Sequence, residues 1–131
     1  MRLADKAKAA LGLCQQLSAS QALEGKQVYI EQLNELWPDI RCRLNPEGRL
    51  CVYVLAERVQ RVPKSLGFHA HYIEEVRKNG TARVVKNKLG HGPRIGHILP
   101  EPTIELGAFD ATFDLTEPLS AWERIMGDDD F

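Results

Sequence analysis

The stretch Ile40-Arg-Cys-Arg-Leu-Asn-Pro-Glu-Gly-Arg-Leu-Cys-Val-Tyr-Val-Leu-Ala56 decides the fold of this 131-residue chain. Residues 40–44 alternate apolar and basic side chains, which is typical of a strand with one buried face. Residues 45–48 read Asn-Pro-Glu-Gly and predict a turn, because proline presets its own φ and glycine accepts a positive one. Residues 50–56 are almost continuously apolar and predict a central strand. We therefore expect a β-hairpin within residues 39–62.

The two cysteines of this hairpin admit two interpretations. Pairing across the turn is expected to place Cys42 opposite Cys51. A shared metal ion would explain such a pair, but the C-x-x-C spacing of most thiolate sites is missing. Two small buried thiols in a sheet are the better interpretation. Together with Cys14 they are too few for a disulfide framework, which favours a reducing compartment.

Residues 1–38 predict a helical hairpin. In residues 2–17 the apolar positions recur at alternating intervals of four and three. We expect this narrow, alanine-rich stripe to pack within its own domain, and a homodimer through helix 2–17 is the alternative. The stripe consists of Leu3, Ala7, Ala10, Cys14 and Leu17.

A second helix should follow at once. Ser18 and Gln21 have the spacing of a capping box. Pro38 disfavours helical geometry at the preceding residue and should end the helix there. The buried face of this helix is expected to contain Leu23, Ile30, Leu33 and Trp37.

Residues 63–115 predict a helix, a strand, a loop and a further strand. A helix over 63–78 would end at Asn79-Gly80, since both residues tolerate a left-handed conformation. Residues 81–89 then predict a strand, and three glycines with three prolines in residues 90–102 predict a loop. Residues 103–115 return to strand alternation, with a bulge expected near Gly107. The inward face of the predicted helix is Leu66, Ala70, Ile73 and Val76.

The last residues, 116–131, predict a short helix and an acidic tail. Thr116 would cap this helix and Pro118 would stand in its first turn. The whole chain, residues 1–131, thus predicts a single α+β domain. In this domain a helical hairpin packs on a small, mostly antiparallel sheet with a central helix and a short C-terminal helix.

Charge is distributed very unevenly along the chain. The net charge is −1, yet residues 58–94 hold nine basic residues against two acids, and residues 101–131 hold one against nine. Opposed fields of this kind point to a charged partner rather than to a neutral surface. We therefore predict a small soluble accessory protein that binds nucleic acid or another polyanion. The expected contact residues are Arg83, Lys86, Lys88 and Arg94, assisted by Lys64, Arg77 and Lys78.

The basic segment holds few aromatic residues on which unpaired bases could stack, only Phe68 and Tyr72. Recognition of a duplex or of the phosphate backbone is therefore expected ahead of single strands. A second hypothesis is a protein-binding inhibitor or adaptor that uses the acidic C-terminal face, with Asp110 and Asp114.

The loop Gly90-His-Gly-Pro-Arg-Ile-Gly-His97 is the most suggestive local feature. Its glycines would let backbone N–H groups approach an anion, and Arg94 could hold a phosphate. A third hypothesis makes His91 and His97 the acid and base of a small phosphodiesterase. A tight surface turn explains the same residues equally well, and a binding protein is favoured over an enzyme.

No metal site, cofactor or membrane contact is predicted. Two residues apart on a helix, His69 and His71 would point about 200° apart and would not share an ion. No apolar run approaches the length that spans a bilayer. The charged N-terminus does not fit a signal peptide, so we expect a cytoplasmic protein.

Overall fold

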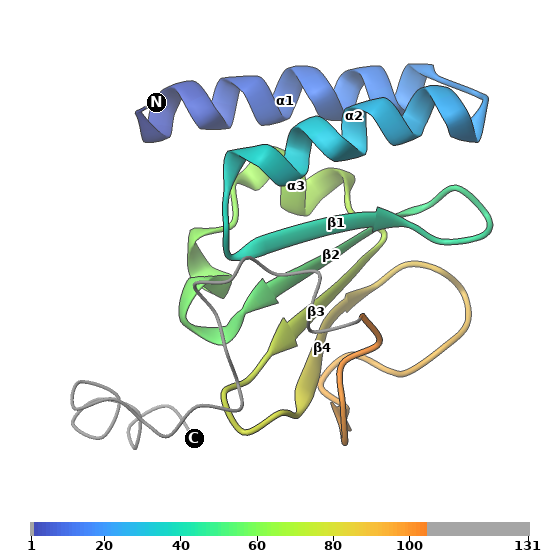
Figure 1. The fold of residues 1–131 in the computed structure, drawn as a ribbon. Coiled ribbons are helices and arrows are strands. Elements are labelled where there is room, and N and C mark those ends of the chain that lie inside the picture. The colour runs from blue at the N-terminus through green and yellow to red at the C-terminus, as the bar shows by residue number, and fades with distance from the viewer. Residues whose placement is uncertain (1, 105–131) are drawn as a thin grey trace.

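The computed structural model describes residues 2–104 of the chain. Its helices lie on one face of a five-stranded mixed sheet with the strand order β1-β2-β3-β4-β5 (Figure 1). This arrangement confirms the α+β class with an N-terminal helical hairpin. The elements are α1 (Leu3–Ala19), α2 (Leu23–Leu36), β1 (Ile40–Leu44), β2 (Leu50–Leu55), the 3-10 helix η1 (Ala56–Arg61), α3 (Lys64–His69), β3 (Tyr72–Val76), β4 (Ala82–Asn87) and β5 (Ile98–Leu99).

The strand directions divide the sheet into two ends. β2 and β3 are parallel, while β1–β2, β3–β4 and β4–β5 are antiparallel. The turn between β1 and β2, the junction between α3 and β3 and the end of β4 therefore meet at one end of the sheet. The β3–β4 turn lies at the other end. This division decides which charged residues can act together.

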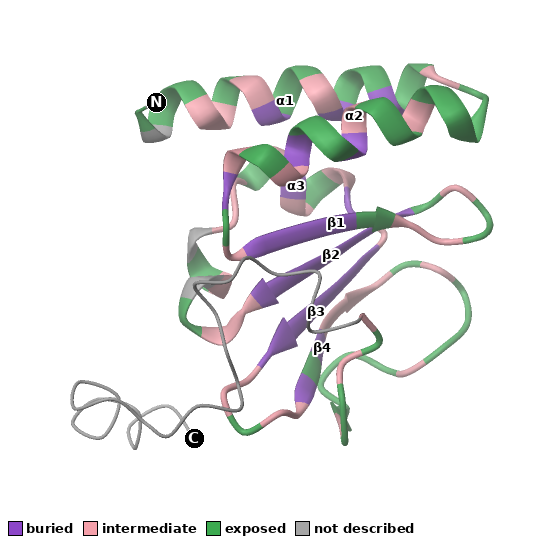
Figure 2. Cartoon of the chain, viewed as in Figure 1, coloured by how far each residue is buried: buried purple, intermediate pink, exposed green. Residues whose placement is uncertain are grey.

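Each face of the sheet carries its own apolar cluster. Figure 2 shows buried positions on the sides of α1 and α2 that turn toward the sheet and along β1, β2 and β3. The cluster between helices and sheet contains Ala10, Cys14, Leu17, Ile30, Leu33, Trp37, Ile40, Cys42, Leu50, Val52, Val54, Leu66, Ala70 and Ile73. The smaller cluster on the opposite face contains Cys51, Tyr53, Tyr72, Val76 and Val84.

The helical hairpin differs in detail from the sequence prediction. Three members of the α1 stripe are buried inside the chain, so the residues that suggested a homodimer make intramolecular contacts. The predicted capping box is wrong: α1 runs through Ser18, and Ala22 precedes α2 without a side-chain cap. Leu23 is 49% exposed because it stands in the first turn of α2, beyond the sheet. Trp37 ends α2 in extended geometry, as Pro38 requires.

The predicted helix 63–78 is wrong in its second half. α3 ends at His69, Ala70 is extended, and β3 follows. The N–H of His71 donates to the carbonyl of Leu50 over 2.8 Å, which starts the parallel ladder with β2. The predicted inward positions 66, 70, 73 and 76 are all buried. A short helix followed by a strand happens to bury positions at helical spacing.

The Asn79-Gly80 pair forms the β3–β4 turn rather than a helix stop. The N–H of Gly80 donates to Arg77, and the N–H of Arg77 donates to Thr81. Gly80 has φ +86°, which only glycine adopts freely. The pair therefore signals a hairpin, and the prediction that it ends a helix is wrong.

The expected Cys42–Cys51 register is wrong by one residue. Cys42 pairs with Val52 and Cys51 with Arg43, because the turn occupies the five residues 45–49. A shift of one residue sends the two thiols to opposite faces of the sheet. They cannot share a ligand, and all three cysteines are free and buried. Burial raises the pKa of Cys14 to about 11 and, as the largest cause, that of Cys42 to about 12.

The outer edge of β1 is covered by a side chain of α2. The amide of Asn34 donates to the carbonyl of Cys42 over 3.0 Å and accepts its N–H over 2.6 Å. Nearby, the guanidinium of Arg41 donates to the carbonyls of Asn34 and Trp37 at the C-terminal end of α2. These contacts fix the hairpin of helices against the edge strand.

The segment after β4 returns over the second face of the sheet. β5, which the loop prediction for 90–102 did not include, pairs with β4. Glu74 is fully buried beneath this segment and accepts hydrogen bonds from the hydroxyl of Tyr72 and from both the N–H and the hydroxyl of Thr103. The predicted strand 103–115 beyond residue 104, the C-terminal helix, the acidic tail, Asp110 and Asp114 lie outside the described residues.

Candidate functional site

The predicted basic contact residues are divided between the two ends of the sheet. At the β3–β4 turn, Arg77 approaches Glu75 (Nε to Oε1, 3.5 Å) and Lys78 approaches Glu57 (Nζ to Oε1, 3.1 Å). Arg83 is exposed and stands opposite Glu75 in the ladder. Carboxylates therefore offset much of the positive charge at this end.

Lys86 and Lys88 lie at the other end of the sheet. The N–H of Lys88 donates to the carbonyl of His71 over 2.6 Å. The five residues of β3 separate this end from the β3–β4 turn by about 16 Å. Lys64, in the first turn of α3, and Arg94, in the loop after β4, are both exposed. The seven basic residues predicted to contact the ligand are thus divided between the two ends of the sheet and do not form one patch.

Two basic residues from outside that segment join Lys86 and Lys88. Lys26 extends from α2 to the carbonyl of Gly48 (Nζ to O, 3.4 Å), and Arg49 closes the β1–β2 turn. Burial lowers the pKa of His71, and the charges of Arg49, Lys86 and Lys26 lower it further. Three cations from three separate elements therefore act on one histidine. We call Lys26, Arg49, His71, Lys86 and Lys88 the cationic end.

A small cavity opens at the cationic end, between α1, α2, the β1–β2 turn and the end of α3. Its volume is about 70 Å³. Buried apolar residues form its floor, while its rim is polar and reaches solvent. Nδ1 of His71 is shielded from solvent and has no hydrogen-bond partner among the described residues. The floor consists of Cys14, Leu17 and Leu50, with Leu44 beside it, and the rim of Ser18, Lys26, Gly48, His69 and His71.

Lys86 positions the end of α3 beside this cavity. Its ammonium donates to the carbonyls of Gly67 (2.7 Å) and Phe68 (3.1 Å), two of the acceptors that the end of a helix leaves free. Burial, then the charge of Lys88, lowers the pKa of Lys86. The side chain of Phe68 points out of the protein and is 80% exposed.

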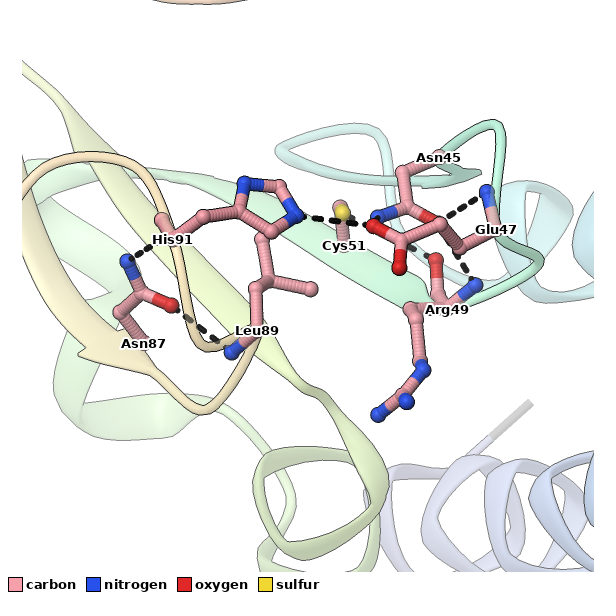
Figure 3. Close-up of polar contacts among 7 residues, drawn as sticks. All are labelled: Asn45, Glu47, Arg49, Cys51, Asn87, Leu89 and His91. Carbon is pink, nitrogen blue, oxygen red and sulfur yellow. Dashed lines mark hydrogen bonds and ion pairs between the residues drawn. The ribbon is translucent and has the colours of Figure 1, made fainter.

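A polar contact joins the loop after β4 to the β1–β2 turn (Figure 3). Nε2 of His91 lies 2.8 Å from Oε1 of Glu47. The hydrogen bond to His91 lowers the pKa of Glu47. The Asn45 side chain shapes the turn by accepting the N–H groups of Glu47 and Arg49, over 3.0 and 2.8 Å. Both partners of this contact are exposed, so it is a surface contact.

Asn87 holds the base of the same loop. Its amide nitrogen donates to the carbonyls of His91 and Pro93, and its oxygen accepts the N–H of Leu89. The N–H groups of Gly96 and His97 also donate hydrogen bonds to carbonyls of the chain. The loop Gly90–His97, which was predicted to bind an anion, thus uses two of its N–H groups for its own structure. No contact in the described part of the chain joins the rings of His91 and His97, the proposed acid and base.

His69 and His71 share one cavity, contrary to the helical geometry expected for them. The chain leaves the helix between them, so both side chains line the same space. Within residues 2–104, no group of three or more histidine, cysteine, aspartate or glutamate side chains could hold a metal ion. The same range contains no helix with the length and apolar character needed to cross a bilayer.

Sequence reasoning missed Lys26 and Arg49 because they belong to the part of the chain whose charges balance. They reach His71 only through the pairing of β2 with β3 and the packing of α2 over the sheet. No local signal marks them. Neither a protein-family model, nor a curated protein, nor a solved structure matches this chain, so its function rests on the geometry alone.

Proposed function

We propose that this protein binds a nucleic acid or another polyanion at the cationic end. One arrangement carries the proposal: three cations from elements far apart in sequence meet around one cavity. Lys26 lines the cavity, Arg49 closes the β1–β2 turn at the same end of the sheet, and the ammonium of Lys86 bonds the end of α3. Their charges also lower the pKa of His71. Convergence of like charges raises the free energy of the empty site, and an anion relieves it. Lys88 extends the same positive surface, and phosphate is the polyanionic group that such side chains bind best.

This proposal moves the predicted interface. Lys86 and Lys88 stay within it, whereas Arg77 and Lys78, which have acidic partners, are placed outside. Lys64, Arg83 and Arg94 become peripheral. The three cysteines are free thiols, which fits the cytoplasmic location that we propose for the protein.

The test is a titration of fluorescently labelled oligonucleotides, single-stranded and duplex, at about 50 and about 200 mM salt. Each phosphate contact should steepen the plot of log affinity against log salt by about 0.7 on a single strand or about 0.9 on a duplex. Replacing Lys26, Arg49 and Lys88 together with alanine should remove about two to three units of this slope. These three side chains were chosen because Lys86 also holds α3.

A matched variant replaces Lys8, Lys64 and Arg83 with alanine. It removes the same number of charges from exposed positions outside the cationic end. It should bind nearly as the wild-type protein does. Equal losses in both variants would mean that net charge alone matters, and salt-independent binding or none would refute the proposal.

A further inference from the structure

An exposed aromatic ring adjoins the cavity of the cationic end. The rings of Phe68 and His69 meet edge to face, with centroids 5.4 Å apart and planes at 87°. His69 lines the cavity. Phe68 is therefore one ring away from the cavity, and one face of its side chain is open to solvent.

The combination of an open phenyl ring with neighbouring cations is the arrangement that binds unpaired bases. Every base has a π face that stacks on an aromatic side chain, while lysines and arginines follow the phosphates. Tyr72, the other aromatic residue of the basic segment, is only 4% exposed and cannot serve. A duplex keeps its bases stacked on one another and offers Phe68 no such partner. The exposure of Phe68 thus favours a single strand, against the expectation from its sequence.

The cavity suits one tetrahedral oxyanion. Its volume of about 70 Å³ holds little more than two water molecules. Its rim offers the hydroxyl of Ser18, the ammonium of Lys26 and the imidazoles of His69 and His71 as donors. The buried floor shields one side of a bound anion from water, which strengthens its attraction to this rim.

We propose that the cationic end binds the phosphorylated terminus of a single-stranded nucleic acid, with the terminal phosphate in the cavity and the adjacent base on Phe68. This inference rests on the proposed function and specifies its ligand. A phosphate inside a strand carries two substituents and a single negative charge. A terminal phosphomonoester carries one substituent and a charge of about −1.5 to −2.

The two subsites are neighbours. The ring of Phe68 meets that of His69, and His69 lines the cavity. Ser18 approaches the same ring, with Oγ 3.5 Å from Nδ1 of His69. The rim is therefore formed by side chains that already lie side by side.

The experiment compares single strands of about ten nucleotides with identical sequence and different ends: a 5′-phosphate, a 3′-phosphate or hydroxyls only. Anisotropy titrations at about 50 mM salt should give a preference of about tenfold for one phosphorylated end, because charge-assisted hydrogen bonds are added. The two phosphorylated arms distinguish which terminus is bound. The ratio of affinities, phosphorylated over hydroxyl, is the diagnostic quantity.

Two variants test the two subsites. Ser18→Leu places an apolar side chain on the cavity rim at an exposed helix position, which should reduce the ratio to about one. Phe68→Ala should weaken binding of single strands by about tenfold and leave duplex binding unchanged. Ile95→Ala, at another strongly exposed apolar residue, is the control and should leave single-strand binding unchanged.

Equal affinity for phosphorylated and hydroxyl ends would overturn the inference and leave the proposed function standing, provided that binding falls with salt. Preference for the duplex, or an unaltered affinity in Phe68→Ala, would do the same. If no oligonucleotide binds in a salt-dependent manner, both the inference and the proposed function fail.

Discussion

The buried carboxylate of Glu74 should hold the segment around Thr103 on the sheet, and replacing it tests this directly. Glu74 has no exposed surface. Its oxygens accept the hydroxyl of Tyr72 over 2.5 Å, the N–H of Thr103 over 2.8 Å and the hydroxyl of Thr103 over 2.6 Å. Glu74→Leu keeps most of the volume and removes every acceptor.

The expected loss in the free energy of unfolding follows from where the three donors go. The hydroxyl of Tyr72 is buried, and leaving it without its acceptor costs about 1–3 kcal/mol. The two donors of Thr103 regain water because this residue is exposed, so each costs only about 0.5–1.5 kcal/mol. Relief of carboxylate desolvation offsets part of the total. We expect a loss of about 3 kcal/mol, or roughly 10 °C in Tm for a chain of this size.

Urea unfolding measures the global loss, and hydrogen exchange measures the local one. The amide of Thr103 should lose its protection in Glu74→Leu. Glu75→Leu, on the neighbouring residue and the other face of the sheet, should leave that amide protected. Tyr72→Phe alone should cost about 1 kcal/mol.

Combining Tyr72→Phe with Glu74→Leu removes the stranded hydroxyl. The double variant should therefore be more stable than the sum of the two single losses predicts, by about 1 kcal/mol or more. Additive losses, or a Glu74→Leu protein as stable as the wild type, would refute this account of the buried carboxylate.

Three further predictions concern glycine, thiol and imidazole chemistry. Gly48→Ala should lose about 1–2 kcal/mol in urea unfolding, because Gly48 has φ +79° and an added Cβ would lie 3.0 Å from Cδ2 of Leu23. Gly12→Ala, where an added Cβ meets nothing within 4 Å, should instead gain about 0.5–1 kcal/mol as a helical position; losses in both would point to another cause. The thiols of Cys14 and Cys42, with pKa values raised by burial to about 11 and about 12, should react with a disulfide reagent only as fast as the protein opens, so fast labelling without denaturant would contradict their burial. The pKa of His71 is lowered in the folded state. Its contribution to stability is therefore complete above its unfolded pKa of about 6.5 and is lost as pH falls through the folded pKa. His71→Asn should make Tm fall less steeply at acid pH, and an unchanged dependence of Tm on pH would argue against the shift.

The parts of the fold that sequence predicts are those whose signals are local. The Trp37-Pro38 stop ends α2, and the Asn45–Gly48 turn separates two strands, because each depends only on neighbouring backbone. β3 could not be predicted from its own residues, and the reason is physical. It contains two buried glutamates, one of which bonds Thr103, 29 residues away, and its ladder with β2 is non-local. Residues 72–76 alone carry no signal of these distant contacts.

The cationic end shows the same limit. Lys86 and Lys88 belong to a segment whose positive charge is visible in the sequence. Arg77 and Lys78 belong to the same segment, but in the fold they lie beside carboxylates. Spacing along the chain does not tell these two pairs apart. Their separation follows from the β3–β4 hairpin: β3 leads to Arg77 and Lys78 at one end of the sheet, and the antiparallel β4 returns to the other end with Lys86 and Lys88.

The amide of Asn34 has a consequence for how this protein behaves when crowded. It bonds both the N–H and the carbonyl of Cys42, in the middle of the free edge of β1. A strand from another molecule would have to pair with β1 along this edge. One side chain of α2 thereby protects this edge strand, as prolines or charged residues do in the edge strands of other proteins. Growth of intermolecular β-structure from the β1 edge is thus hindered at its first step, by a residue outside the apolar core clusters.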